Sequence, residues 1–264
     1  MQTTTTKSRE PATEQTGILA GHLAGLASPR VQRFDLYAAI HKALRMMMTD
    51  TLVRVGSTDA GSATDVRETL AIVRDLLTGC EKHIAKENKY VHPALERARP
   101  GASSQIASEH GEHADCIEEL AELALQIETT DGEVRQLALQ RLYRALALFI
   151  SENFEHMHYE ETEHNAVLWA HYTDVELAEL HHTIIAAIPA EEMRAIAHWM
   201  IPAITAHERL AMLSEMQQTA PVPAFRAMLN LARARLSPTE WAKLARGLNV
   251  SVAPQISPDS FSVG

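Results

Sequence analysis

The sequence predicts an all-α protein, an antiparallel four-helix bundle followed by a helical C-terminal extension. Apolar residues recur at helical spacing in long segments up to Tyr172. These segments are rich in Ala, Leu, Glu, Met and Arg, which favour helix, and short polar loops separate them. No stretch of any length alternates apolar and polar residues in the way that is typical of a β-strand.

The four segments of the predicted bundle span about 33–56, 65–99, 103–128 and 133–172. Asp65 is the predicted N-cap of the second segment, and Pro100-Gly101 ends it. Pro93 is expected to bend the last turns of the same segment. The short connections favour antiparallel neighbours, so we expect residues 33–172 to form the bundle.

Beyond Tyr172 the helical segments become shorter, and proline, serine or threonine marks their starts. Their length and apolar content predict that residues 173–248 are a helical extension packed on the bundle. Residues 1–32 contain many Thr, Gly and Ser and are expected to be a flexible N-terminal segment. Residues 249–264 are expected to be a disordered tail.

Composition and charge exclude several function classes. The 264 residues carry a formal net charge of −10 with no basic stripe, so we expect no nucleic-acid partner and no anionic membrane surface. No apolar run has the length of a membrane span, and the polar start MQTTTTKSRE lacks the apolar region of a signal peptide. Cys80 and Cys116 form no CxxC motif and are expected to be reduced. These features predict a cytoplasmic protein and leave its oligomeric state open.

A histidine followed four residues later by a glutamate occurs on two of the predicted bundle helices. HIAKE runs from His83 to Glu87 on the second helix, and HMHYE runs from His156 to Glu160 on the fourth. Residues four apart share one face of a helix, and the neighbours on these faces are largely apolar. A buried imidazole or carboxylate without a partner is costly. A multivalent cation at the centre of the bundle would satisfy both pairs.

The first and third segments offer further imidazoles to the same interior. The predicted metal ligands are therefore His41, His83, Glu87, His110, His113, His156 and Glu160. This mixed nitrogen and oxygen set suits iron, manganese or zinc better than calcium. Carboxylates that can bridge favour a two-metal site. We expect iron in a di-iron centre, with manganese or zinc as alternatives.

The other histidines and two tyrosines carry less weight. His158 is two residues from His156 and should point away from the site. Three histidines near segment ends are expected to be solvated: His92, His164 and His171. Four histidines of the extension form no HxxxE or HxxxH pair: His181, His182, His198 and His207. Tyr37 and Tyr90 lie one turn from His41 and Glu87 and are expected to be core residues.

The order H…HxxxE…H…HxxxE on four helices resembles the hemerythrin-like, or HHE cation-binding, domain from about Phe34 to Tyr172. The stretch NFEHMHYEETEHNAVLWAHYTDVELAEL is similar to bacterial members with a helical C-terminal extension. It also resembles the fourth helix of the hemerythrin-like domain in an iron-sensing ubiquitin-ligase subunit. The resemblance implies ligands at six positions, namely His41, His83, Glu87, His110, His156 and Glu160. His113 takes the place of the family's usual leucine, where it replaces His110, supplements it or lies just outside the ligands.

The sequence departs from the oxygen-carrying members of that family. Those members have HxxxH on the third helix and HxxxxD on the fourth, whereas this chain has HxxH and HxxxE, with Glu161 at the position of the aspartate. The additional carboxylate makes the site richer in oxygen and favours the oxidised metal. The resemblance implies binding of O2, NO or peroxide, or the buffering or sensing of iron. Two alternatives stay open: an enzyme acting on peroxide, NO or ferrous iron, and a helical interaction module with a structural metal site.

Overall fold

The computed structural model describes residues 33–251, which contain helices and no strand, so the predicted all-α class is confirmed. Residues 1–32 and 252–264 lie outside the described residues, and so do the predicted N-terminal segment and most of the predicted tail. Among the described helices, none combines the length and the apolar character that a membrane span requires.

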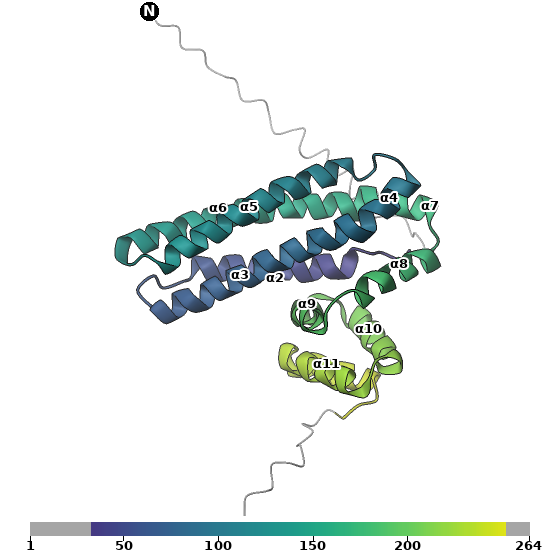
Figure 1. Ribbon diagram of the computed structural model, residues 1–264. Helices are drawn as coiled ribbons and strands as arrows, with labels where there is room; N and C mark the ends of the chain where they lie inside the picture. Colours follow the sequence, from purple (N-terminus) through teal and green to yellow (C-terminus); the bar gives the residue numbers. More distant parts are fainter. Residues whose placement is uncertain (1–32, 252–264) are drawn as a thin grey trace, which may run out of the picture. The chain divides into compact units, whose positions relative to one another are not determined.

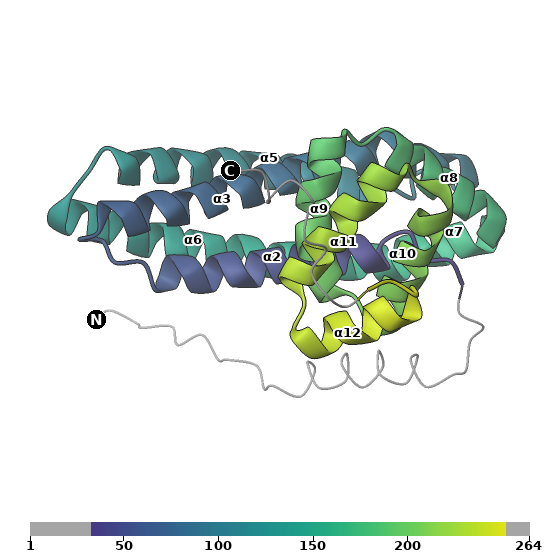
Figure 2. The same ribbon diagram turned by 90° about the horizontal axis from the view of Figure 1, so that it is seen from below.

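Four long helices lie side by side (Figures 1 and 2). They are α2 (Ala38–Gly56), α3 (Ala63–Lys86), α5 (Ser104–Glu128) and α6 (Gly132–Tyr159). Helix α2 packs against α3 and α6, and α5 packs against the same two helices, so the four surround one core. Two of the helices continue through π-helical turns into short helices at one end of the bundle. Helix α3 passes through η1 (Glu87–Val91) into α4 (His92–Ala98), and α6 passes through η2 (Glu160–His164) into α7 (Asn165–His171).

Most of the length of the bundle is held together by apolar side chains at helical spacing. Leu70 and Leu76 of α3 and Leu142 and Leu146 of α6 are completely buried in this core. Each such side chain contributes about 1.5–3 kcal/mol relative to an exposed one. The polar cluster described below interrupts this packing only near the η1 and η2 end of the bundle.

The start of α3 differs from the prediction by three residues. Ser62, not Asp65, is the N-cap, because its hydroxyl accepts a hydrogen bond from the Asp65 amide at 3.2 Å. The Asp65 carboxylate instead accepts hydrogen bonds from Arg54 and from the Asp59 amide. Serine and aspartate are equally good caps, so the sequence alone does not choose between them.

Five shorter helices form the extension: α8 (Asp174–Ala186), α9 (Ala190–Ala203), α10 (Ala206–Thr219), α11 (Val222–Arg235) and α12 (Pro238–Gly247). Three of them start with a capping box, in which a hydroxyl and a glutamate three residues later satisfy each other's backbone amides. Helix α9 packs against α2 of the bundle and against α11. Figure 2 shows α12 beside α10 and α11, with which it shares a second apolar cluster.

The extension also reaches the bundle through two ion pairs. Lys42 of α2 donates to Glu208 of α10 at 2.6 Å, and Lys86 of α3 pairs with Glu192 of α9. Each lysine directly adjoins a predicted metal ligand in the sequence, since Lys42 follows His41 and Lys86 precedes Glu87. The extension therefore packs over the part of the bundle that carries the candidate site.

Replacing Arg209 with alanine is expected to loosen the extension and leave the bundle intact. The Arg209 side chain is buried and donates to the carbonyls of Ile201 at 2.7 Å and Ile204 at 2.9 Å, at the end of α9. Loss of these bonds leaves buried carbonyls without donors, which costs about 3 kcal/mol. Hydrogen exchange should show faster exchange in α9–α12 and unchanged protection in α3 and α6. Arg226→Ala, at an exposed position, is the control and should leave exchange unchanged in both regions. Equal exchange rates in the two variants would refute the role of Arg209 in holding the extension together.

Candidate metal centre

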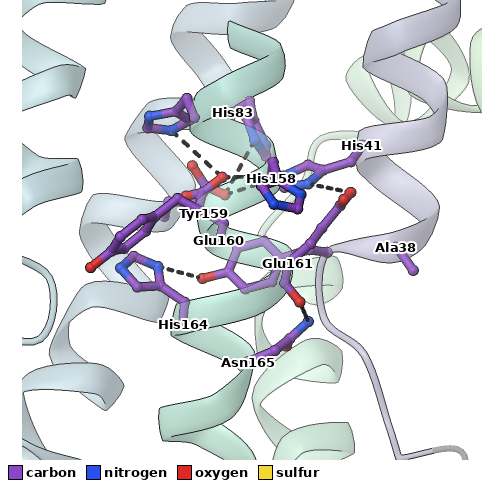
Figure 3. Close-up of polar contacts among 12 residues, drawn as sticks. Ala38, His41, His83, His158, Tyr159, Glu160, Glu161, His164 and Asn165 are labelled. Atoms are coloured by element: carbon purple, nitrogen blue, oxygen red, sulfur yellow. Dashed lines mark hydrogen bonds and ion pairs between the residues drawn. The ribbon is translucent and has the colours of Figure 1, made fainter. Parts of the chain in front are cut away.

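Six of the seven predicted ligands converge at one end of the bundle, where they form two groups. One group contains His41, His83, Glu87 and Glu160; the other contains Glu87, His110, His156 and Glu160. Within each group, one ligand atom from every residue lies within 4.8 Å of the others. The two groups have different histidines and share both glutamates. Figure 3 shows His41, His83 and Glu160 coming together from separate helices.

The distances show how the glutamates connect the groups. Oε1 of Glu87 lies 3.2 Å from Nε2 of His83, and Oε2 of Glu87 lies 3.4 Å from Nε2 of His110. The two oxygens of one carboxylate thus face histidines of different groups. Oε2 of Glu160 lies 3.4 Å from Nε2 of His41 and 3.5 Å from Nε2 of His156. Each of the two carboxylates thus lies between histidines of different groups and could contact a cation held by either group.

Three histidines of the site are oriented by polar partners on their outer side. Nδ1 of His41 lies 3.0 Å from Glu161, which also accepts hydrogen bonds from Arg45. Nδ1 of His156 lies 2.9 Å from Glu109. Burial opposes the charged form of Glu161, but hydrogen bonds from His41 and Arg45 outweigh it and lower the pKa of Glu161 to about 2. An ionised carboxylate only accepts hydrogen bonds, so each Nδ1 donates and Nε2 of the same ring faces the centre. In the neutral ring, Nε2 then offers its lone pair to a cation.

The third oriented histidine completes the same pattern. Nδ1 of His110 lies 2.8 Å from the side-chain oxygen of Asn88 and donates to it. Nε2 of His110 then faces Nε2 of His156 at 3.2 Å, a distance at which a proton on one nitrogen would make a hydrogen bond to the other. If both rings are neutral, their lone pairs face each other, and a cation beside the two nitrogens would satisfy both.

The unpartnered atoms of the cluster fit bound metal ions. Nε2 of His41, Nε2 of His83 and both carboxylate oxygens of Glu87 and of Glu160 are buried and have no hydrogen-bond partner. Burying so many acceptors without a donor is costly, and a cation satisfies all of them at once. Four imidazole nitrogens and two carboxylates are donors that transition-metal ions accept. The residues therefore fit a metal centre on their own chemistry.

The electrostatics of the cluster also favour a cation. Burial and the neighbouring charge of Glu87 raise the pKa of Glu160. Burial opposes the charged form of His41, but the neighbouring carboxylates of Glu161, Glu87 and Glu160 outweigh it and raise the pKa of His41 to about 9. Without metal, a proton on His41 thus offsets part of the repulsion between the two glutamates. A metal ion would displace this proton, because ligands bind in their deprotonated form.

The metal-free protein is expected to lose stability as the pH falls from about 6.5 to about 4. Burial lowers the pKa of His83, His92, His113 and His164 to about 4, against about 6.5 in an unfolded chain. Between these values the unfolded chain binds more protons, so the stabilisation is complete above pH 6.5 and is lost as the pH falls through 4. The contribution of His41, whose pKa is raised, is complete below pH 6.5 and is lost only as the pH rises through 9.

Urea unfolding of the metal-free protein at pH 7 and pH 5 checks this prediction. Each pKa unit corresponds to about 1.4 kcal/mol, so we expect the free energy of unfolding to be several kcal/mol lower at pH 5. An equal free energy of unfolding at the two pH values would show that these imidazoles are not held neutral by the fold.

His113 lies beside the two groups and belongs to neither. It is buried on α5, and its Nδ1 has no hydrogen-bond partner. The centroid of its ring lies 4.8 Å from that of His156 and 5.9 Å from that of Phe149. Of the two histidines on α5, the geometry therefore brings His110 to the shared glutamates. Glu161, at the position of the family's aspartate, contacts His41 from outside and is likewise in neither group.

Two histidines that we expected to be solvated are instead buried. His92 and His164 are 7% and 1% exposed, so the prediction is wrong for both, whereas His171 is exposed as predicted. Both buried residues belong to or directly follow a π-helical turn, which turns them inward. Tyr37 is buried as predicted, and its hydroxyl lies 3.1 Å from Nδ1 of His164.

The outer partners Asn88 and Glu109 were not identified from the sequence as parts of the site, and Glu161 was noted only at the position of the family's aspartate. Each of them directly adjoins a predicted ligand, since Asn88 follows Glu87, Glu109 precedes His110 and Glu161 follows Glu160. Their only signal in the sequence is that a polar residue adjoins a predicted ligand. Exposed helix positions carry the same residue types, so this signal does not distinguish them.

Comparison with known proteins agrees with this geometry. Residues 33–166, just over half of the chain, match the hemerythrin HHE cation binding domain. No curated protein and no solved structure matches the chain. The matched range contains all of the residues in the two groups and ends within α7. The chain therefore belongs to the hemerythrin HHE cation-binding family.

Proposed function

We propose that this chain is a non-haem di-iron protein whose centre binds O2, NO or a related small ligand, or buffers or senses iron. The observation that supports two ions is the pair of shared glutamates. Two groups with separate histidines and common carboxylates provide two neighbouring positions, each with two imidazoles, joined by Glu87 and Glu160. Two-metal sites in proteins separate their ions by about 3.5–4 Å, which bridging carboxylates can span.

The proposed ligands are His41 and His83 for one ion, His110 and His156 for the other, and Glu87 and Glu160 for both. His113 is proposed as a neighbour that packs against His156 and excludes water. Iron is preferred because imidazole and carboxylate together suit iron in both of its common oxidation states. Manganese and zinc accept the same donors and are the alternatives for metal analysis.

The small number of protein donors supports a small-ligand function. Two imidazoles and two shared carboxylates would hold each iron ion, and iron held by so few protein donors could also bind a small molecule such as O2 or NO. The protein's own contribution is to hold the imidazoles by Glu109, Glu161 and Asn88 and to keep the carboxylates away from solvent. Such outer partners raise the basicity of the ligands and fix their direction.

Metal analysis of protein purified without oxygen, combined with optical titration, tests the proposal. We expect two iron ions per chain and a change in the near-ultraviolet and visible spectrum when NO or azide is added. Matched His158→Ala protein, altered at an exposed position two residues from His156, should behave identically. Absence of iron, together with an unchanged melting temperature on adding ferrous iron, would exclude the proposed function.

A further inference from the structure

The outer face of α6 carries a continuous row of exposed side chains, which we name the α6 stripe. Its positions are separated by three or four residues, so they lie on one side of the helix. In chain order they are Val134, Leu137, Arg141, Arg144, Leu148, Glu152 and Glu155. Leu137 and Leu148 are 60% and 67% exposed. Large apolar side chains that repeat along one exposed row, with charged residues around them, are typical of a protein-protein contact.

The fold leaves the α6 stripe open. The extension contacts the bundle on α2 and α3, and Figure 1 shows α5 and α6 on the opposite side of these helices from α9 and α11. The charged side chains of the stripe make no ion pair within the part of the chain that the structure describes; they are Arg141, Arg144, Glu152 and Glu155. Both the charges and the leucines are therefore available to a partner.

The charges of the stripe are arranged symmetrically about Leu148. Arg144 and Glu152 lie four residues before and four residues after it, and Arg141 and Glu155 lie seven residues before and after it. In a two-fold symmetric contact between two copies of one helix, the helices run antiparallel, and positions at equal distances before and after the crossing residue meet. If the crossing residue is Leu148, each arginine of one copy meets a glutamate of the other.

The same register pairs apolar residues at its centre and at both ends. Leu148 of one copy meets Leu148 of the other on the two-fold axis. Leu137 lies eleven residues before Leu148, and Tyr159 lies eleven residues after it, so these two side chains also meet. Tyr159 is half-buried and keeps part of its ring accessible. Each pairing in this register thus joins opposite charges or two apolar side chains.

We propose that this chain forms a two-fold symmetric dimer through the α6 stripe, with the two α6 helices crossing antiparallel at Leu148. A parallel pairing would place Arg141 and Arg144 beside their own copies, where like charges repel. The net charge of −10 on each chain opposes association. Charges more than about 8 Å apart are largely screened at physiological ionic strength, however, whereas the paired charges are in contact.

The dimer should be weak and should not depend on bound metal. One helix face from each copy buries less than the about 1,600 Å² of a standard interface, and small interfaces of this kind are typical of transient complexes. We therefore expect the full-length chain to dimerise with a dissociation constant in the micromolar range and to dissociate on dilution.

Sedimentation equilibrium of two charge-reversal variants of the full-length chain tests the proposal. Arg141→Glu with Arg144→Glu makes the stripe acidic, and Glu152→Arg with Glu155→Arg makes it basic. We expect each variant alone to dimerise at least about tenfold more weakly than the wild type, because the ion pairs on both sides of the two-fold axis become like-charge contacts. An equimolar mixture should recover a one-to-one dimer, since opposite charges then meet again.

Matched controls separate the stripe from general changes in charge or hydrophobicity. Leu148→Glu should weaken the dimer at least about tenfold, because an apolar contact on the two-fold axis is replaced by two facing carboxylates. Leu125→Glu, at an exposed leucine of α5, should change the dissociation constant less than twofold. Arg67→Glu with Arg226→Glu changes the net charge as much as the acidic variant does, at exposed positions outside the stripe, and should also dimerise like the wild type.

The outcomes that would overturn the proposal are distinct. A wild type that stays monomeric at every concentration would show that two copies do not pair through the stripe. A dimer that survives unchanged in Leu148→Glu and in both charge-reversal variants would place the interface elsewhere. Two charge-reversal variants that are folded by circular dichroism, monomeric alone and still monomeric when mixed would refute the antiparallel register.

Discussion

Replacing Glu160 with glutamine is expected to abolish binding of both metal ions and, at the same time, to raise the melting temperature of the metal-free protein. Glu160 is fully buried and belongs to both ligand groups, so its loss affects two ions and not one. Removing even an outer partner of a metal ligand typically costs 10- to 100-fold in affinity, and removing a shared ligand should cost more.

The stability of the metal-free protein should change in the opposite direction. Burial and the charge of Glu87 raise the pKa of Glu160, which means that the fold disfavours its ionised form. Glutamine has nearly the same shape and no charge, so it removes the repulsion with Glu87. We therefore expect the metal-free variant to melt at a higher temperature than the metal-free wild type at pH 7. Sites that store such strain for function commonly gain stability when the functional group is removed.

Metal content and melting curves of three variants separate this account from a general loss of folding. His83→Ala removes a histidine of one group only and should leave about one metal ion per chain. Glu160→Gln should leave none, and His158→Ala should keep two. Equal metal content in His83→Ala and Glu160→Gln would contradict the shared role of Glu160. A lower melting temperature of metal-free Glu160→Gln would contradict the repulsion between the glutamates.

Adding ferrous iron to the metal-free wild type is expected to produce the second large effect, a melting temperature higher by roughly 8–16 °C. Metal that binds only the folded state at 1,000 times its dissociation constant stabilises it by about 4.1 kcal/mol, and in domains of 150–250 residues each kcal/mol corresponds to about 2–4 °C. The ions would displace the proton from His41 and offset the repulsion between Glu87 and Glu160. They would also satisfy the buried acceptors that have no hydrogen-bond partner.

Differential scanning calorimetry at pH 7.5 measures this shift, and metal-free Glu160→Gln is the matched control. The shift should disappear in the variant and should reverse in the wild type on adding a chelator. A wild-type melting temperature that ferrous iron, manganese and zinc all leave unchanged would exclude a metal site at this position.

The fold was predictable because its signals are long and repeated. Apolar residues at helical spacing run through each bundle helix, and the proline, serine and threonine residues of the extension mark the starts of its helices. The start of α3 was not predictable to the residue, because Ser62 and Asp65 both have good capping side chains. The π-helical turns were also not predictable, since no single residue type causes them: η1 precedes Pro93, whereas η2 forms without proline.

The candidate site was predictable where two ligands share one helix. The spacing of His83 and Glu87, and of His156 and Glu160, gives a common face from the sequence alone. The choice between His110 and His113 depends on how α5 is rotated in the bundle, which packing determines. His92 and His164 were wrongly expected to be solvated because one follows a π-helical turn and the other ends one. A π-turn changes the number of residues per turn, so spacings of three and four residues no longer identify the buried side of the helix.

X-ray diffraction from crystals of the iron-loaded chain, with anomalous differences measured at the iron edge, would locate the bound ions. We expect two anomalous peaks about 3.5–4 Å apart. One ion should contact His41 and His83, the other His110 and His156, and Glu87 and Glu160 should contact both. A single peak, or peaks away from these six side chains, would rule out a two-iron centre joined by Glu87 and Glu160.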